Sequence, residues 1–349
     1  MLFRPIGSTG LQVSEIGFGC ADNAGLIVRA TTQERTEAVA RALELGVNYF
    51  DTSPDYGKGL SETNLGMTFR ELGMRPFITT KVEVMPPDLS DIAGAVIRSV
   101  EASLKRLGLD YVDILQIHNP PHAKTDPTVQ GWIYLSVEDF LRPRGCLEGM
   151  ARLRREGKVR FLGFACEHAE APAVRQLLDT GEFQMINVWY DLLNPTSGVP
   201  TPPGMQVEDE YGLIIDHAAA LGDGTAVIRP LAGGALTDHA AGGGARHRYA
   251  GGGLSRNLTG YQQMVEQARS LAFLSQEGRH TLAQAAVRFI LSNPGVTTVL
   301  GGFSELAHLE EMAVCSGAGP LSEENMARIE MVWRANFGRW GHQRWSAAG

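Results

Sequence analysis

The chain has few cysteines, few basic residues and no long apolar run. Its four cysteines, Cys20, Cys146, Cys166 and Cys315, are scattered over 349 residues, and none forms a C-x-x-C pair. This pattern indicates free thiols in a reducing compartment rather than a disulfide framework. The formal net charge of −8 argues against broad nucleic-acid binding, which requires clustered Lys and Arg. We therefore expect no nucleic-acid partner.

Segments that would place the chain in or across a membrane are also missing. No apolar run approaches the ~18 residues that a membrane helix requires. The first residues, MLFRPIGSTG, carry an arginine and a turn where a signal peptide needs an apolar core. The sequence predicts no membrane partner and a cytoplasmic location, and it does not indicate an oligomeric state.

What the sequence does contain is an alternation of strand-like and helix-like segments. The start, LFRPIGSTGLQVSEIGFG, is typical of a hairpin around Ser8-Thr9-Gly10 that leads into a strand. Strand-like apolar runs occupy 15–19, 47–50, 76–82, 112–118, 159–165, 184–190, 225–230 and 296–301. Several are too continuously apolar to have one face in water, which favours parallel strands buried on both faces. We predict an α/β fold: a single domain over 1–349, a (β/α)8 TIM barrel with the Met1–Val13 hairpin closing its bottom. An open doubly wound sheet is the alternative.

The segments between the strands include two helices with clear ends. Ser90 is predicted to cap a helix over Asp91–Leu107, which Gly108 would end. A second helix is predicted over Thr281–Leu291, before a proline that blocks its continuation. Two connections, 119–145 and 232–257, are long. The second includes GGALTDHAAGGGARHRYAGGG, which is too rich in glycine for a stable helix and is predicted to be either a mobile lid or a partly disordered insertion.

Four chemically reactive side chains follow consecutive predicted strands. Asp51 ends the second strand, Tyr56 lies in the next loop, Lys81 lies near the end of the third strand, and His118 ends the fourth. In a parallel barrel these positions share the face where active sites lie. A tyrosine has a pKa of ~10, which a neighbouring ammonium lowers, while a carboxylate would hold that ammonium in place. Each residue alone has a structural explanation, such as a salt bridge or a hydrogen-bonded histidine, but their shared placement favours proton transfer.

The sequence resembles the aldo-keto reductases over nearly its whole length. The resemblance rests on RPIGSTGLQVSEIGFG, NYFDTSPDYG, ITTKV, SVEASLKRLGLDYVDILQIHNP, LRREGKVRFLGFA, IRPLAGGAL and TLAQAAVRFILSNPGVTTVLGGFSELAHLEE, in that order. It implies a catalytic tetrad on Asp51, Tyr56, Lys81 and His118. It also implies a nicotinamide cofactor bound without a Rossmann domain, and the chain indeed has no G-x-G-x-x-G that follows a strand and opens a helix.

The resemblance further implies cofactor contacts at the ends of the later strands. Asn187 aligns with a glutamine that holds the carboxamide, whereas Ala165-Cys166 replaces a Ser-Asn pair, so that Glu167 or His168 would have to substitute. The loop after strand seven, with Leu231 and Gly233, would hold the pyrophosphate. Ile228 stands where an aromatic residue often stacks on the nicotinamide. Arg229 either reaches a phosphate or forms an ion pair at the barrel rim.

The adenosine end would lie after strand eight, where this chain departs from the family pattern. Gly302 and Phe303 occupy the positions of basic residues that read a 2′-phosphate, His308 stands where Arg or Gln is common, and Met312 replaces an adenine-contacting asparagine. Without a fixed guanidinium, preference for the 2′-phosphate should weaken. NADP is the cofactor by family default, and NAD stays open.

The remaining predictions concern substrate and metal. Trp132, in the loop after His118, is expected to wall an apolar or sugar-binding pocket with Tyr56 and His118. His118 and His122 flank two prolines, which prevent the helical spacing of a zinc pair, so no metal is expected. Cys166 is more typical of a buried small hydrophobe than of a nucleophile.

These features favour an NAD(P)-dependent oxidoreductase that interconverts an aldehyde, ketone or sugar and its alcohol. An NAD-preferring aldose dehydrogenase is one alternative, and a cofactor-binding regulatory subunit, a role that some members of this family have at ion channels, is another.

Overall fold

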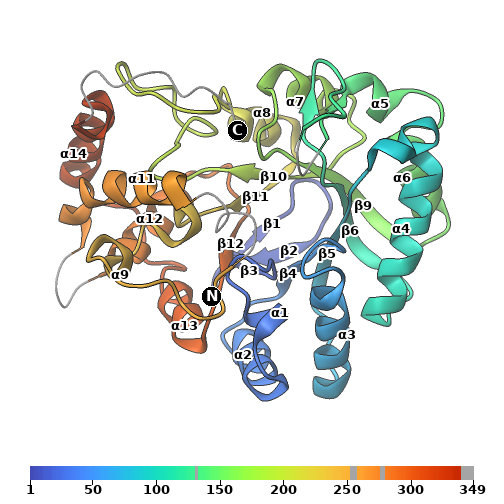
Figure 1. Ribbon diagram of the computed structural model, residues 1–349, viewed down its shortest axis with the longest axis horizontal. Coiled ribbons are helices and arrows are strands. Elements are labelled where there is room, and N and C mark those ends of the chain that lie inside the picture. The colour runs from blue at the N-terminus through green and yellow to red at the C-terminus, as the bar shows by residue number, and fades with distance from the viewer. Residues whose placement is uncertain (130–132, 252–257, 276–279, 339–349) are drawn as a thin grey trace.

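Eight parallel strands close into a barrel in the order β10-β11-β12-β3-β4-β5-β6-β9. The computed structural model describes residues 1–129, 133–251, 258–275 and 280–338. The barrel strands are β3 (Ile16–Gly19), β4 (Tyr49–Asp51), β5 (Phe77–Val82), β6 (Val112–Ile117), β9 (Val159–Ala165), β10 (Met185–Trp189), β11 (Gly224–Ile228) and β12 (Thr298–Gly302). Each overlaps one of the predicted runs. The (β/α)8 barrel is confirmed, and the open sheet is excluded by the closure (Figure 1).

Helices surround this barrel and bury its outer face (Figure 1). They are α1 (Leu26–Arg29), α2 (Thr32–Glu44), α3 (Leu60–Leu72), α4 (Ile92–Leu107), α5 (Val137–Leu141), α6 (Cys146–Arg155), α7 (Ala171–Leu178), α8 (Ile214–Leu221), α9 (Asp238–Ala241), α11 (Leu258–Arg269), α12 (Leu282–Leu291), α13 (Leu306–Ala313) and α14 (Glu323–Arg334). Short 3-10 turns occupy Pro86–Ser90, Ala232–Gly234, Ala272–Leu274 and Asn336–Gly338. None of the helices among the described residues is long and apolar enough to cross a membrane.

The ends of α4 and α12 follow from local capping chemistry. Thr281 caps α12 through a capping box with Gln284, and Gly108 ends α4 in the left-handed conformation at φ 67°. The prediction that Ser90 caps α4 was wrong. Ser90 is the last residue of the 3-10 turn that two prolines begin, and Asp91 caps the helix by accepting a bond from the Gly94 amide at 3.3 Å.

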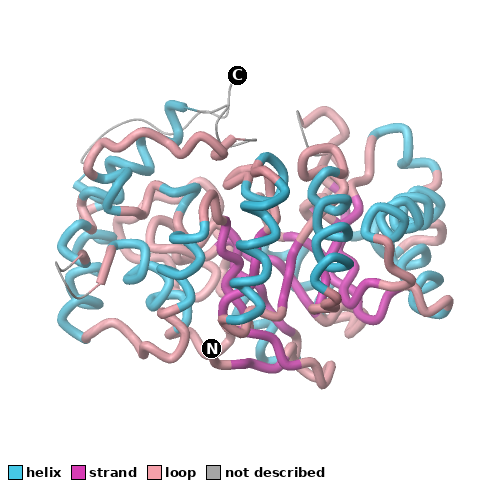
Figure 2. Tube along the Cα trace, turned by 90° about the horizontal axis from the view of Figure 1, so that it is seen from below, coloured by secondary structure: helices cyan, strands magenta, loops and turns pink. Residues whose placement is uncertain are grey.

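An N-terminal hairpin closes the bottom of the barrel, as predicted. Strands β1 (Phe3–Pro5) and β2 (Gln12–Ser14) pair antiparallel. The hairpin side chains Ile6, Leu11 and Val13 pack with residues from inside the barrel, namely Tyr49, Ile114, Met185, Ala226 and Leu300. Figure 2 shows the hairpin below the barrel strands. Because this end is filled, a ligand site inside the barrel must open at the opposite, carboxyl end of the strands.

The two long connections differ from a plain loop. The first carries short strands β7 (Pro121–His122) and β8 (Leu135–Ser136) and helix α5; Trp132 lies outside the described residues. The glycine-rich connection forms one helical turn, α9, which the sequence did not predict. Its hydroxyl cap, Thr237, accepts a bond from the Ala240 amide at 3.1 Å.

The described part of the glycine-rich connection, 232–251, is tied to the segments that follow β3, two strands along the barrel from β11. Arg248 pairs with Glu34 at 3.0 Å, and the Tyr249 hydroxyl donates to the same carboxylate at 2.8 Å. The Gly251 amide donates to the Asn23 carbonyl at 2.8 Å. The segment therefore runs from the end of β11 to the loop before α1 and the start of α2.

Candidate active site

The four predicted catalytic residues meet at the carboxyl ends of adjacent strands. β4 ends at Asp51, β5 carries Lys81 one residue before its end, and β6 ends one residue before His118. The Lys81 ammonium donates to the Asp51 carboxylate, and its Nζ lies 5.0 Å from the centroid of the Tyr56 ring. The Tyr56 and His118 rings meet edge to face with centroids 5.8 Å apart. The geometry brings together one carboxylate, one ammonium, one phenol and one imidazole.

Asp51 is held by a second polar residue from across the barrel. Its Oδ2 accepts a bond from Asn187 Nδ2 at 2.9 Å, and Asn187 Oδ1 accepts one from Gln116 Nε2 at 2.8 Å. All three side chains are buried. Asn187 was predicted to hold a cofactor amide; in this structure both ends of its own amide are engaged inside the barrel. The part played by Gln116 was not foreseen.

The surroundings set the protonation of the two proton-transfer candidates. Burial, followed by the charge of Lys81, holds the pKa of His118 well below its usual value, so the imidazole is neutral near pH 7. Burial, followed by the charges of Asp51 and Glu167, raises the pKa of Tyr56 well above its usual value. This direction is opposite to the lowering expected from Lys81. The main reason is burial, which disfavours the phenolate, and the charge of Asp51 beside Lys81 adds to it, so Tyr56 is a protonated phenol.

These residues line a cavity of about 690 Å³ at the barrel mouth. The tetrad contributes to its wall, and so do most of the predicted cofactor contacts: Asn187, Arg229, Leu231, Gly233, Gly302, Phe303, His308 and Met312. Cys166 does not line it. Its side chain is fully buried in the core between barrel and helices, and burial raises the pKa of its thiol. The chain offers Ala165 and Glu167 to the cavity at this point instead.

Arg229, which follows β11, reaches Glu167, which follows β9, and both side chains line the cavity. Its guanidinium pairs with the Glu167 carboxylate and stacks 4.3 Å above the Trp189 ring. Two roles were predicted for Arg229, a contact to a cofactor phosphate and an ion pair at the barrel rim, and the structure contains the ion pair. His168, the other predicted substitute for the Ser-Asn pair, is paired with Asp209 at 2.7 Å. Glu167 therefore brings a carboxylate, balanced by Arg229, close to Tyr56.

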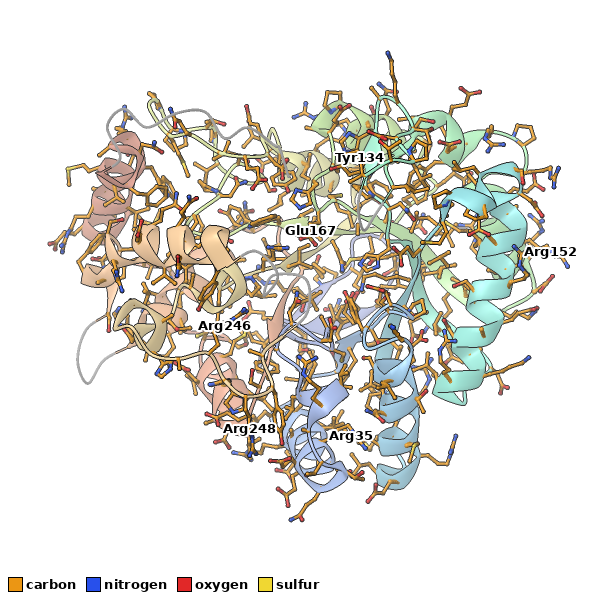
Figure 3. All side chains as sticks on the ribbon, viewed as in Figure 1. Arg35, Tyr134, Arg152, Glu167, Arg246 and Arg248 are labelled. Carbon is orange, nitrogen blue, oxygen red and sulfur yellow. The ribbon has the colours of Figure 1, made fainter. Side chains whose placement is uncertain are left out.

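The glycine-rich connection supplies cavity residues that sequence reasoning missed. His239, Arg246 and His247 line the same cavity as the tetrad. The basic run ARHR among glycines was a visible signal, but it has no periodicity that would place it over the barrel mouth. Figure 3 shows Arg246 beside α9 and α11, well apart from Glu167. No group of three or more His, Cys, Asp or Glu suited to a metal ion occurs among the described residues.

The cavity suits a dinucleotide in size and in chemistry. Its volume lies within the ~300–1,000 Å³ typical of small-molecule sites. Acid–base groups lie in one part of its wall, and the buried Arg246 Nη1 in another part has no hydrogen-bond partner among the described residues. An anionic group of a bound cofactor would satisfy such a nitrogen.

Comparisons with known proteins agree with this reading. The Aldo/keto reductase family model matches residues 15–334. L-galactose dehydrogenase of Arabidopsis thaliana is 34% identical over 46% of this chain and 47% of its own length. L-glyceraldehyde 3-phosphate reductase of Escherichia coli is 26% identical over 95% of this chain and 92% of its own.

A protein named "Probable voltage-gated potassium channel subunit beta", from Arabidopsis thaliana, is 26% identical over 89% of this chain and 90% of its own length. The holo form of an aldo-keto reductase from Bacillus halodurans shares the fold, with a TM-score of 0.69 over 96% of this chain and 97% of that one, at 21% identity. With a family match over nearly its whole length and a closed eight-stranded parallel barrel, this chain belongs to the aldo/keto reductase family.

Proposed function

We propose that this chain is an NAD(P)-dependent oxidoreductase that interconverts a small carbonyl compound and its alcohol, with Tyr56 as general acid and base. The observation that carries the proposal is the meeting of Tyr56, Lys81, Asp51 and His118 in the wall of one cavity. Proton donors are needed there because reduction of a carbonyl places negative charge on its oxygen.

Each member of the set has a physical role in this proposal. A bound nicotinamide would supply the hydride for reduction, or accept it in oxidation. The Tyr56 phenol donates a proton to the carbonyl oxygen as charge develops, and its raised pKa keeps that proton available at neutral pH. The Lys81 ammonium, 5.0 Å from the ring centroid, stabilises the phenolate left behind. The neutral His118 ring donates a hydrogen bond that orients the carbonyl.

The charges around Tyr56 favour a neutral substrate. Burial first, and then the negative charges of Asp51, Glu167 and Asp55, raise the pKa of its phenol, so three carboxylates act on the reacting oxygen. The guanidinium of Arg229 lies near but is paired with Glu167. A phosphorylated carbonyl would meet repulsion at this end, so we propose a neutral aldehyde, ketone or sugar rather than a sugar phosphate.

Two alternatives have support from particular relatives. An NAD-preferring aldose dehydrogenase is favoured by the half-length similarity to L-galactose dehydrogenase. A cofactor-binding regulatory subunit is favoured by the similarity to a protein named as a potassium channel subunit. The intact tetrad favours catalysis over pure regulation.

To test the proposal, cofactor binding is measured first and substrate turnover second. Quenching of protein fluorescence by NADPH and NADH measures cofactor affinity. Absorbance at the nicotinamide band then follows turnover of neutral aldehydes, ketones and aldoses, with matched sugar phosphates as controls. Binding without turnover of any carbonyl or alcohol would favour the regulatory alternative. Faster turnover of the phosphorylated partner in each pair would contradict the proposed substrate class.

A further inference from the structure

Two buried amides and the Asp51 carboxylate form a row of hydrogen bonds inside the barrel. Gln116 Nε2 donates to Asn187 Oδ1 at 2.8 Å, and Asn187 Nδ2 donates to Asp51 Oδ2 at 2.9 Å. None of the three residues is more than 2% exposed. An ionised carboxylate can only accept hydrogen bonds, so Asp51 fixes the direction of the whole row. Gln116 and Asn187 are called the amide ladder below.

The amide ladder spans one strand of the barrel. Gln116 lies in β6 and Asn187 in β10, and β9 lies between them in the sheet. The residue of β9 in register with Gln116 is Gly163, and a Cβ there would lie 3.2 Å from Gln116 Cγ. The same Cβ would lie 2.0 Å from the Met185 carbonyl oxygen, so glycine is also needed for the pairing of β9 with β10. Because Gly163 has no side chain, the Gln116 amide has room to reach Asn187.

Gln116 lowers the stability of the fold, which indicates a role other than packing. Its Oε1 is buried and has no hydrogen-bond partner among the described residues. A buried acceptor without a partner costs free energy, whereas an apolar side chain of similar shape would not. Gln116 is also not among the described residues that line the barrel-mouth cavity, so contact with a ligand there does not explain it. Its bond to Asn187 is the contact that gives it a role.

Asp51 accepts hydrogen bonds from two sides of the barrel. Lys81, of the neighbouring strand β5, donates to Oδ1, and Asn187, of the strand directly across the barrel, donates to Oδ2. Lys81 Nζ also donates to the Thr52 carbonyl oxygen at 3.0 Å, so the backbone helps to hold the ammonium in place. The negative charge of Asp51 is therefore shared between an ammonium and an amide.

We propose that Gln116 and Asn187 are positioning residues for proton transfer: the amide ladder partly compensates the charge of Asp51, so that more of the Lys81 charge acts on the Tyr56 phenol. An amide is a stronger donor when its own oxygen accepts a bond, so Gln116 acts through Asn187. The inference rests on the proposed function, in which Tyr56 transfers the proton. It assigns Asn187 to the tetrad rather than to the carboxamide of a cofactor.

The ladder acts on the acidity of Tyr56. Burial raises the pKa of this phenol most, and the charge of Asp51 is the next cause. The other groups that face the phenol are Glu167, Asp55 and Cys20, which also raise its pKa, with Lys81 5.0 Å from the ring centroid and His118 at the ring edge. Because Asp51 acts on Tyr56 more than any other charge, an amide that compensates Asp51 makes the phenolate easier to form.

Gln116→Met tests the ladder without changing the cavity wall. It exchanges one unpartnered acceptor, Gln116 Oε1, for another, Asn187 Oδ1, so thermal stability should change little. The pH at which alcohol oxidation reaches half its maximal rate should rise, and kcat at neutral pH should fall about two- to fivefold. KM and the cofactor dissociation constant should stay within about twofold. Thr298→Val is the control, since Thr298 is also buried in a barrel strand with an unpartnered hydroxyl in the described structure, and it should change none of these quantities.

A measurement without substrate separates this inference from the proposed function. Difluorotyrosine at position 56 has a more acidic phenol than tyrosine, and its ¹⁹F resonance reports ionisation. The titration midpoint should lie at higher pH in Gln116→Met than in the otherwise unchanged chain, and at higher pH still in Asn187→Ala, which removes the donor itself.

Equal midpoints in all three proteins would overturn the inference. It would also be wrong if Gln116→Met lost cofactor affinity while its pH profile of kcat stayed as in the wild type, since the ladder would then serve the cofactor. Shifted midpoints in a protein that turns over no carbonyl or alcohol would support the action of the ladder on Tyr56 and refute the proposed function.

Discussion

Replacing Tyr56 by phenylalanine removes one oxygen from the cavity and little else. The ring keeps its edge contact with His118 and its place near Lys81, so packing and the Lys81–Asp51 pair should survive. What is lost is the only proton donor proposed for the carbonyl oxygen. General acid–base groups contribute ~10²–10⁴-fold in rate. At ~1.36 kcal/mol per tenfold, this corresponds to about 2.7–5.4 kcal/mol in the activation free energy of the reaction.

The assay compares kcat of Tyr56→Phe with that of the wild type on a substrate found in the turnover screen. The dissociation constant for the cofactor, measured by fluorescence, should stay within about twofold, since the phenol binds no part of the cofactor in this proposal. Loss of both binding and turnover would point to a disturbed cavity rather than to lost chemistry.

Tyr49→Phe is the matched control. Tyr49 is also a barrel tyrosine, but it lies in the closed bottom and its hydroxyl bonds Thr79 Oγ1 at 2.6 Å. Its loss should lower the free energy of unfolding by ~1 kcal/mol, the net value of one hydrogen bond, without a large change in kcat. Turnover of Tyr56→Phe near the wild-type level would refute the assignment of Tyr56 as the acid.

Three further outcomes are expected. Because the pKa of Tyr56 is raised, a stopped-flow pH series should show reduction nearly level through neutrality and falling only at alkaline pH, and alcohol oxidation rising with pH as the phenolate forms; oxidation fastest below pH 6 would contradict this. Asn187→Ala removes the bond that orients Asp51, so kcat should fall about tenfold and the pH profile of kcat should shift. An unchanged pH profile in this variant would mean that Asn187 only fills space. Gly66→Ala places a Cβ 2.3 Å from the Leu107 carbonyl where α3 meets α4, and it should cost about 1–3 kcal/mol in a denaturant titration; an unchanged midpoint would show that the helices separate freely.

The barrel was predictable because its strands carry a strong signal. β6 and β9 lie within mostly apolar runs, and all of β6 and the last four residues of β9 are buried, as expected for a sheet covered on both faces. The ends of elements were less predictable. Ser90 and Asp91 are both good caps, and only the 3-10 turn formed by the preceding prolines decides between them.

The residues of the candidate site also differ in how clearly the sequence indicates them. The positions of the predicted tetrad follow from strand ends. Asp51 ends its strand, His118 directly follows its strand, Lys81 lies one residue before a strand end, and Tyr56 lies in the loop after Asp51. Gln116 gave a weaker signal, since it is one of two polar side chains in a mostly apolar strand, and its bond to Asn187 depends on the order of strands around the barrel. Arg246 gave almost none, because a glycine-rich segment has no period from which to infer the surface that it covers.

The raised pKa of Tyr56 changes how the Lys81–Asp51 pair should be understood. Lys81 alone would make the phenol more acidic, but burial raises the pKa of Tyr56 most, and the Asp51 carboxylate offsets the charge of the ammonium. Asp51 is in turn drawn toward Asn187, on the far side of the barrel. A small movement of Asp51 toward Asn187 would leave more of the ammonium's field on the phenol, so the acidity of Tyr56 depends on how firmly Gln116 and Asn187 hold one carboxylate. That dependence links a buried amide pair, which touches no substrate in this proposal, to the proton that the reaction needs.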